Sequence, residues 1–200
     1  MKLHDVKTTK ILNTIIKKVK KTPDAFFDFG PGHLLSEAWG AKEKWPECFI
    51  IGLEPHVLRY QNLVSQYPGL LFNEAISNKV GTLSGFMGKN EIRKREASDF
   101  TIMDRSKITS GYQKCDMPCV TVDYINKHYG PFKHIFIWAD IQQSELLMLH
   151  GSIKALKSNS ISYIYLELKN KQIKLAKTFL KKYGFTKCLK IYDMDFLFTK

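Results

Sequence analysis

The chain reads Phe26-Phe27-Asp28-Phe29-Gly30-Pro31-Gly32-His33 at residues 26–33. The apolar run that opens this stretch lies between Pro23 and Gly30, which is typical of a short buried strand. Two glycines then allow the backbone to turn tightly and to approach a ligand where a Cβ atom would clash. Residues 34–44 have the pattern of a helix. The stretch therefore predicts a strand, a tight turn and a helix, the unit from which α/β sandwiches are built.

The same alternation of strand and helix continues through the chain. Sequence patterns predict further strands at 49–53, 70–75, 82–87, 134–139 and 161–168, and helices at 57–67, 120–129, 144–156 and 171–183. The closing segments 185–190 and 193–199 are close enough in sequence to pair as an antiparallel hairpin. Strands that alternate with helices imply a parallel sheet with right-handed crossovers. We therefore expect an α/β sandwich around a mostly parallel seven-stranded sheet with an antiparallel C-terminal hairpin.

Two segments stand apart from this alternation. Residues 8–21 place apolar side chains at helical spacing opposite lysines, which predicts a basic amphipathic helix within residues 1–22. We expect this helix to end at residues 22–23 and to pack on the edge of the domain. Residues 23–200 are predicted to form one domain. Within it, residues 88–118 are polar and without clear periodicity, which is typical of a variable lid or substrate loop.

The overall composition, 44% apolar and 25% charged, is that of an ordinary soluble globular domain. No apolar run is long enough to cross a bilayer, and the lysine-rich start lacks the apolar core of a signal peptide. We therefore expect a cytoplasmic protein. The four cysteines are scattered, so we expect them to be reduced and expect no metal site.

Positive charge is distributed unevenly within the formal net charge of +12. Residues 150–190 hold ten lysines and one acid, and residues 1–21 hold seven lysines and one acid. Such surfaces attract phosphate, nucleic acid or another anionic partner. Lysines that only solvate helix faces are the alternative interpretation. The sequence leaves the oligomeric state open.

Ligands of a parallel sheet bind outside the carboxyl ends of its strands, so the residues just after each predicted strand are candidates. The sequence places there Asp28, Gly30, Pro31, Gly32, His33, Glu54, Pro55, Glu74, Ala75, Ile76, Asp140 and Gln142. Glu54 can accept hydrogen bonds from ribose hydroxyls, or it is an exposed cap of the next helix. Small Ala75 leaves room for a ring. Leu35, where a dinucleotide loop has its third glycine, favours a cofactor without phosphates, such as S-adenosylmethionine.

Two acids and two histidines are candidates for proton transfer. Asp140 lies at the predicted centre of the sheet, where it can face an ammonium group or a substrate nucleophile, or cap the following helix. Glu167 lies near the end of a strongly apolar strand, where a lone carboxylate is costly to bury. His33 and His134 are weaker candidates, and ordinary loop or strand histidines are the alternative.

Several stretches agree in order and spacing with one family. They are Phe27-Asp28-Phe29-Gly30, Gly52-Leu53-Glu54-Pro55, residues 73–83, residues 120–125, residues 140–145, and the closing Gly184-Phe185 with Asp195-Phe196-Leu197-Phe198. On these stretches, residues 25–200 resemble the FkbM-type methyltransferases. The sequence departs from the family pattern in a shorter loop after Gly30, in Gln143 at a motif glycine, and in Trp138 at a common lysine.

The resemblance implies a class I methyltransferase (Rossmann-like) sandwich, S-adenosylmethionine as methyl donor, and O-methylation of a hydroxyl on a sugar, glycan or other small molecule. We expect Asp140 or Glu167 to orient or deprotonate that hydroxyl. Two alternatives stay open. One is an RNA ribose 2′-O-methyltransferase, with Asp140, Lys169 and Lys17 or Lys18 around the acceptor. The other is a non-catalytic nucleic-acid-binding module on the same fold.

Overall fold

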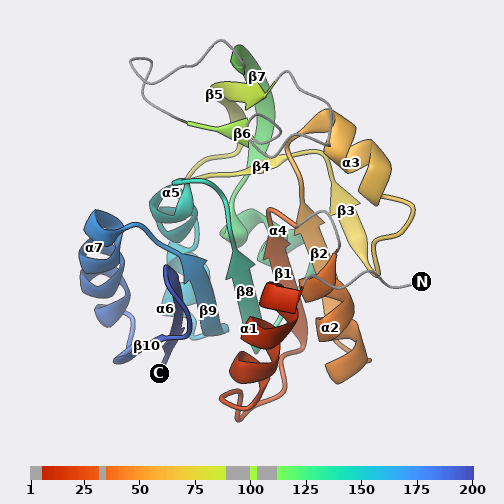
Figure 1. The fold of residues 1–200 in the computed structure, drawn as a ribbon. Helices are drawn as coiled ribbons and strands as arrows, with labels where there is room; N and C mark the ends of the chain where they lie inside the picture. Colours follow the sequence, from red (N-terminus) through yellow and green to blue (C-terminus); the bar gives the residue numbers. More distant parts are fainter. Residues whose placement is uncertain (1–5, 32–34, 89–99, 103–111) are drawn as a thin grey trace.

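The computed structural model describes residues 6–31, 35–88, 100–102 and 112–200. Its main sheet has seven strands in the order β10-β11-β9-β8-β1-β2-β3 (Figure 1). These strands are β1 (Ala25–Phe29), β2 (Phe49–Leu53), β3 (Leu70–Phe72), β8 (Ile135–Ala139), β9 (Ile161–Glu167), β10 (Lys187–Lys190) and β11 (Asp195–Thr199). The strand predicted from the opening stretch, β1, lies at the centre between β2 and β8.

The main sheet is mostly parallel. β1 pairs in parallel with β2 and β8, β2 with β3, and β8 with β9, whereas β11 runs antiparallel to both β9 and β10. The predicted C-terminal hairpin is therefore confirmed. Every residue of β1 and β8 is buried. Because apolar side chains cover both faces of these strands, each reads as a nearly continuous apolar run in the sequence.

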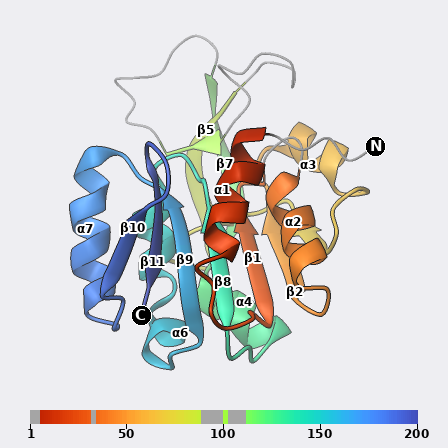
Figure 2. The same cartoon turned by 60° about the horizontal axis from the view of Figure 1, so that its bottom comes forward.

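Helices cover both faces of the sheet. One face packs against α1 (Val6–Ile16), α2 (Ser36–Lys44) and α3 (Val57–Leu63), and the other against α4 (Val122–Tyr129), α5 (Glu145–His150), α6 (Ile153–Lys157) and α7 (Asn170–Lys181). Figure 2 shows α1 lying across the central strands. Leu12 of α1 is buried with Phe26 and Phe136 of those strands, so the prediction that this helix packs on the edge was wrong. Gly40 of α2 allows the close approach, because a Cβ there would overlap the Leu12 side chain.

Several predicted elements end earlier than their sequence patterns indicated, among them the helices predicted at 57–67 and 171–183, which end at Leu63 and Lys181. α1 ends at Ile16 and not at residue 21. The backbone N–H groups of Lys20 and Lys21 instead donate to the Tyr163 hydroxyl of β9, each at 3.0 Å, which draws this segment onto the sheet. The predicted strand 70–75 stops at Phe72, and the chain then enters a second sheet.

The predicted helix 144–156 is divided into α5 and α6. The Asp123 carboxylate of α4 accepts hydrogen bonds from the N–H groups of Lys154 and Ala155 at 2.9 and 2.8 Å, which starts a new helix at that point. Gly151 lies at the break, where a Cβ would overlap the carbonyl oxygen of Ser77. A contact from a distant part of the chain therefore decides where the helix divides.

The second sheet has four strands in the order β4-β7-β5-β6 and stands over the carboxyl ends of the main strands (Figure 1). Its strands are β4 (Ala75–Ile76), β5 (Gly81–Gly88), β6 (Phe100–Thr101) and β7 (Tyr112–Val120). β5 and β7 pair antiparallel along eight residue pairs, from Gly81 with Cys119 to Gly88 with Tyr112. Much of the described part of 88–118, for which the sequence indicated a loop, is therefore strand.

Candidate active site

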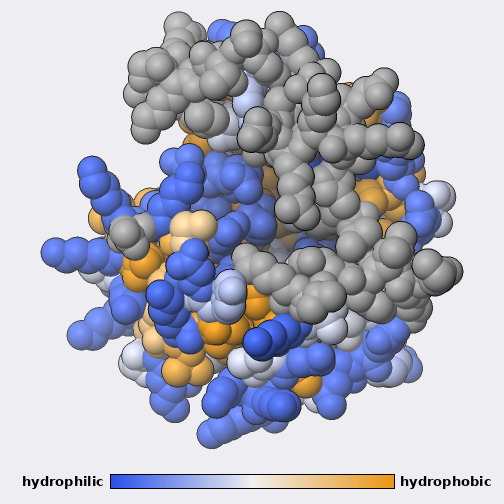
Figure 3. Space-filling view, viewed as in Figure 1, coloured by the Kyte–Doolittle hydropathy of each residue, from blue (hydrophilic) through white to orange (hydrophobic). Residues whose placement is uncertain are grey.

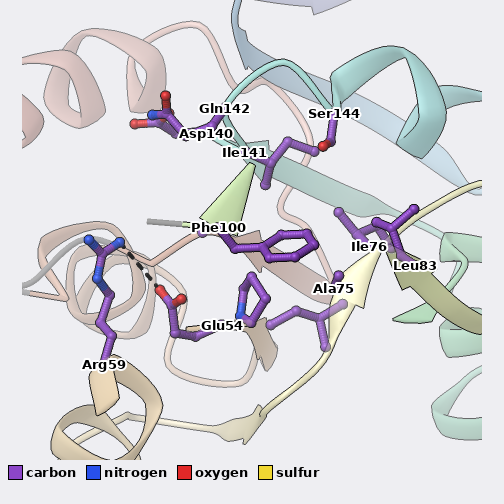
Figure 4. A pocket seen from close by; sticks show the side chains of 13 residues that line it. Glu54, Arg59, Ala75, Ile76, Leu83, Phe100, Asp140, Ile141, Gln142 and Ser144 are labelled. Carbon is purple, nitrogen blue, oxygen red and sulfur yellow. Dashed lines mark hydrogen bonds and ion pairs between the residues drawn. The ribbon is translucent and has the colours of Figure 1, made fainter. Parts of the chain in front are cut away.

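A pocket opens at the carboxyl ends of β1, β2 and β8, beneath the second sheet. It is partly open to solvent. Its lining consists of Gly30, Leu53, Glu54, Pro55, Arg59, Ala75, Ile76, Leu83, Phe100, Asp140, Ile141, Gln142 and Ser144. Figure 4 shows acidic side chains on two sides of the pocket and apolar side chains between them.

Gly30 joins the loop after β1 to the loop after β8. Its backbone φ is 79°, in the left-handed region that glycine adopts readily. A Cβ at this position would overlap the carbonyl oxygen of Asp140. The Gly30 N–H donates to the carbonyl oxygen of Leu53, and the Asp140 N–H donates to that of Phe29, each at 3.1 Å. Glycine is therefore required for the ends of β1, β2 and β8 to meet at the pocket.

Asp28 is fully buried behind this loop and does not line the pocket. Its Oδ2 accepts a 2.9 Å hydrogen bond from the Tyr67 hydroxyl, while its Oδ1 has no hydrogen-bond partner among the described residues. Burial raises the pKa of this carboxyl well above its ordinary value, and the negative charge of Glu37 raises it further. Gly52 makes room for the tyrosine, because a Cβ there would lie 2.5 Å from the Tyr67 hydroxyl.

Glu54 lies in the pocket wall at the end of β2 and is only 2% exposed. Its Oε1 accepts a 2.8 Å hydrogen bond from the His56 N–H, and its Oε2 lies 3.6 Å from Nη1 of Arg59 (Figure 4). Asn73 Nδ2 donates to the carbonyl oxygens of Glu54 and Pro55 at 2.8 and 3.1 Å. The interpretation of Glu54 as an exposed helix cap is wrong, since His56 is the N-cap of α3.

The loop after β8 carries two consecutive residues in the left-handed backbone region, Gln142 with φ 50° and Gln143 with φ 80°. Glu145 Oε1 accepts hydrogen bonds from the N–H groups of Ile141 and Gln143 at 3.3 and 3.4 Å. Gln172 Nε2 of α7 donates to the carbonyl oxygen of Gln143 at 3.3 Å. These bonds hold a conformation that glycine, the family's residue at position 143, adopts without steric cost.

Asp140 and Glu167 meet at the ends of the neighbouring strands β8 and β9, close enough for their side chains to share a hydrogen bond when one of them carries a proton. Burial is the largest cause that raises the pKa of Asp140 well above its ordinary value. The hydrogen bond to Glu167 and the negative charges of Glu167, Glu145 and Glu37 raise it further. The Asp140 carboxylate therefore binds a proton more strongly than an exposed aspartate does.

The structure brings most of the predicted site residues together. The pocket lining includes Gly30, Glu54, Pro55, Ala75, Ile76, Asp140 and Gln142. Asp28, Pro31 and Glu74 do not line it, so their part in cofactor binding stays a prediction. Gly32 and His33 lie outside the described residues.

His134 lies at the wrong end of the sheet for proton transfer in this pocket. It precedes the first residue of β8, and its N–H donates to Asp24 Oδ1 at 2.9 Å, whereas Asp140 follows the last residue of the same strand. The weaker prediction for His134 was therefore wrong.

Several residues at or behind the pocket were not predicted, and five of them have polar or aromatic side chains that shape the site. They are Glu37, Arg59, Tyr67, Phe100 and Gln172. Glu37 and Arg59 are charged residues close to predicted motifs, at the starts of α2 and α3, and could have been noticed for that reason. The other three reach the site through tertiary contacts that leave no local signal.

The mostly parallel α/β sheet and the acid-lined pocket at its carboxyl ends are consistent with a methyltransferase-like protein. The methyltransferase FkbM domain matches residues 38–187. The chain therefore belongs to the FkbM methyltransferase domain family, as the sequence motifs indicated, and methyltransferases of this kind generally use S-adenosylmethionine. Comparison with curated proteins gave no match. Within the described ranges, no helix has the length and apolar character needed to cross a membrane.

Proposed function

We propose that this chain is a class I methyltransferase that transfers a methyl group from S-adenosylmethionine to a hydroxyl of a sugar, glycan or other small molecule. Family membership supports methyl transfer. The strand order, with β1 at the centre and the last strand antiparallel to its neighbours, supports the Rossmann-like class I arrangement.

The residues of the pocket fit this cofactor. Ala75 and Ile76 offer apolar surface to its base, and Glu54 offers a buried carboxylate to its ribose hydroxyls. Asp140, also in the lining, lies where it can face either the ammonium group or the acceptor hydroxyl, and we assign it to the hydroxyl. Among the described lining residues the one cation is Arg59, which lies 3.6 Å from the Glu54 carboxylate. A pyrophosphate-bearing cofactor suits this lining less well.

The observation that carries the proposal is the Asp140–Glu167 pair beside the pocket. When bound, S-adenosylmethionine supplies a methyl group on a cationic sulfur, which is already activated, so positioning of the acceptor accounts for much of the rate. A hydroxyl acceptor must also lose its proton. The raised pKa of Asp140 makes its carboxylate a stronger base than an exposed one, and Glu167 helps to hold the proton that Asp140 accepts.

Calorimetric titration with S-adenosylhomocysteine tests the cofactor, and a methylation assay over a panel of sugars and small hydroxyl compounds tests the reaction. We expect Asp140→Asn to lower turnover by about 100- to 10,000-fold, the usual contribution of a general base. Asp116→Asn is the matched control, since Asp116 is an exposed acid of β7 that hydrogen-bonds to Ser84 outside the pocket. Failure of the wild-type chain to bind S-adenosylhomocysteine would contradict the cofactor, and full turnover by Asp140→Asn would contradict the base.

One surface favours a second candidate function, the methylation or binding of RNA. α7 presents exposed lysines to solvent, and within the described residues they form no ion pair. They are Lys171, Lys174, Lys177 and Lys181, followed by Lys182 at the C-cap of the helix. Figure 3 shows long hydrophilic side chains projecting from the side of the molecule where α7 lies. The helix begins beside the pocket, because Gln172 contacts the loop after β8.

However, the lysines that we expected around the acceptor of an RNA ribose methyltransferase do not lie together. Lys169 follows β9 at the pocket end of the sheet, but Lys17 and Lys18 follow α1 in the segment that leads to the start of β1. Filter binding to RNA between 50 and 200 mM salt distinguishes the candidates, because phosphate contacts make affinity fall about 1,000-fold or more over this range. RNA is excluded as the partner if the wild-type chain binds it weakly and Lys174→Glu changes this binding no more than the control Lys127→Glu on α4 does. Strong RNA binding without binding of S-adenosylhomocysteine would favour the non-catalytic module.

A further inference from the structure

The pocket is roofed by an apolar cluster of the second sheet. Its buried members are Ala75, Met87, Phe100, Met117 and Cys119. Of these, Ala75 and Phe100 also line the pocket. Figure 4 shows the Phe100 ring pointing into the pocket, between Glu54 and Ala75 on one side and Ile141 on the other.

The position of the Phe100 ring is fixed by its packing against the neighbouring strand β5. β6 pairs with β5 through Met87 with Phe100 and Phe86 with Thr101. The ring packs directly on Gly85 of β5, where a Cβ would lie 2.6 Å from Cε2 of the ring. Only glycine at position 85 leaves room for the Phe100 ring, so Gly85 determines the position of the ring beside the pocket.

The second sheet, which forms the roof of the pocket, is joined to residues of the main sheet's loops by a hydrogen bond on each side of the pocket. On one side, His56 Nδ1 accepts a hydrogen bond from the Arg59 N–H, so its Nε2 carries the proton and donates to the carbonyl oxygen of Gly88 at 3.2 Å. On the other side, the Thr101 hydroxyl donates to the carbonyl oxygen of Gln142 at 3.3 Å. Both hydrogen bonds join the second sheet to residues close to two acids of the pocket lining, Glu54 and Asp140.

We propose that Phe100 is the residue that receives the adenine ring, as the aromatic wall of the base subsite. This inference rests on the proposed function. The surfaces that face the ring across the pocket are small or apolar, namely Ala75, Ile76 and Ile141, and a flat aromatic base matches them in chemistry. Packing on Gly85 and the hydrogen bond of the neighbouring Thr101 hold the Phe100 ring in place, so it offers a preformed aromatic surface.

Calorimetric titration with S-adenosylhomocysteine and with adenosine tests this assignment, because the two ligands share the base and differ in the rest. Loss of stacking on one base weakens binding by about 5- to 150-fold. We expect Phe100→Ala to weaken both ligands by a similar factor within this range. Phe100→Leu, which keeps apolar bulk without a π face, should recover only part of the affinity, and Phe100→Tyr should recover most of it.

Met117→Ala is the matched control, since Met117 belongs to the same buried cluster but does not line the pocket. It should destabilise the roof to a similar degree, seen as a lower melting temperature, while the affinity for adenosine changes less than 3-fold. Unchanged or tighter binding by Phe100→Ala would overturn the assignment, as would a loss confined to S-adenosylhomocysteine or an equal loss in Met117→Ala. A wild-type chain that binds neither ligand overturns the proposed function itself.

Discussion

Replacement of Gly30 by alanine tests whether the opening turn holds three strand ends together. Alanine at a φ of 79° costs about 1–2 kcal/mol because its Cβ crowds the following carbonyl. The same Cβ would also overlap the backbone carbonyl oxygen of Asp140, which cannot rotate away as a side chain does. Overpacking of this kind adds about 1–3 kcal/mol. We therefore expect Gly30→Ala to lower the free energy of unfolding by about 2–5 kcal/mol in urea titrations followed by tryptophan fluorescence.

Gly184→Ala supplies the control that separates these two costs. Gly184 also has a positive φ, 85°, but a Cβ there would meet nothing within 4 Å. It should therefore lose only the backbone contribution, about 1–2 kcal/mol. Gly30→Ala should in addition weaken S-adenosylhomocysteine binding, since displacement of the Asp140 carbonyl moves a wall of the pocket. Equal losses of stability in the two variants, with unchanged ligand affinity, would refute the reasoning.

Three further outcomes are expected. Since burial raises the pKa of Asp28, the stability that this residue contributes is greatest at low pH and is lost as pH rises through the raised pKa. Asp28→Asn should therefore give a flatter profile of melting temperature between pH 4 and 9 than the wild-type chain gives. Parallel profiles of the two chains would contradict this expectation. Leu12→Ala should lower the free energy of unfolding by about 2–5 kcal/mol. In that background Gly40→Ala should restore about 1 kcal/mol through helix propensity, because the overlap with the Leu12 side chain is gone. A double-mutant cycle measures this coupling. Gln143→Gly should stabilise the chain by about 0.5–1 kcal/mol, because relief of a φ of 80° gains about 1–2 kcal/mol and the greater entropy loss of glycine on folding offsets about 0.5–1 kcal/mol. A lower urea midpoint would exclude this.

The central strands and the first turn could be predicted because their signals are local. The apolar runs of β1 and β8 follow from burial on both faces, and Gly30 marks the tight turn in the sequence itself. Residues after strand ends, such as Glu54 and Asp140, could then be assigned to one pocket, since parallel strands bring their carboxyl ends to the same edge.

Of the second sheet, β5 was predicted as a strand at 82–87, but the sheet as a whole could not be predicted because β6 and β7 carry no long apolar run. β7 is exposed over much of its length, so polar residues such as Lys114 and Asp116 interrupt the pattern. Its pairing with β5 joins residues as distant as Gly81 and Cys119, and β6 has only two residues. The buried hydrogen bond from the Tyr67 hydroxyl to Asp28 likewise joins residues that are far apart in sequence. Such features depend on tertiary geometry.

The two outer strands of the main sheet have a consequence for how copies of this protein meet. An edge strand presents unpaired N–H and C=O groups that another chain can extend into a continuous sheet. β10 forms one edge and exposes Lys187 and Lys190, whose charges repel an approaching copy. β3 forms the other edge and is only three residues long, too short to template a stable addition. Part of the lysine excess thus protects against aggregation, so neutralising β10 would promote fibre-like association without touching the pocket.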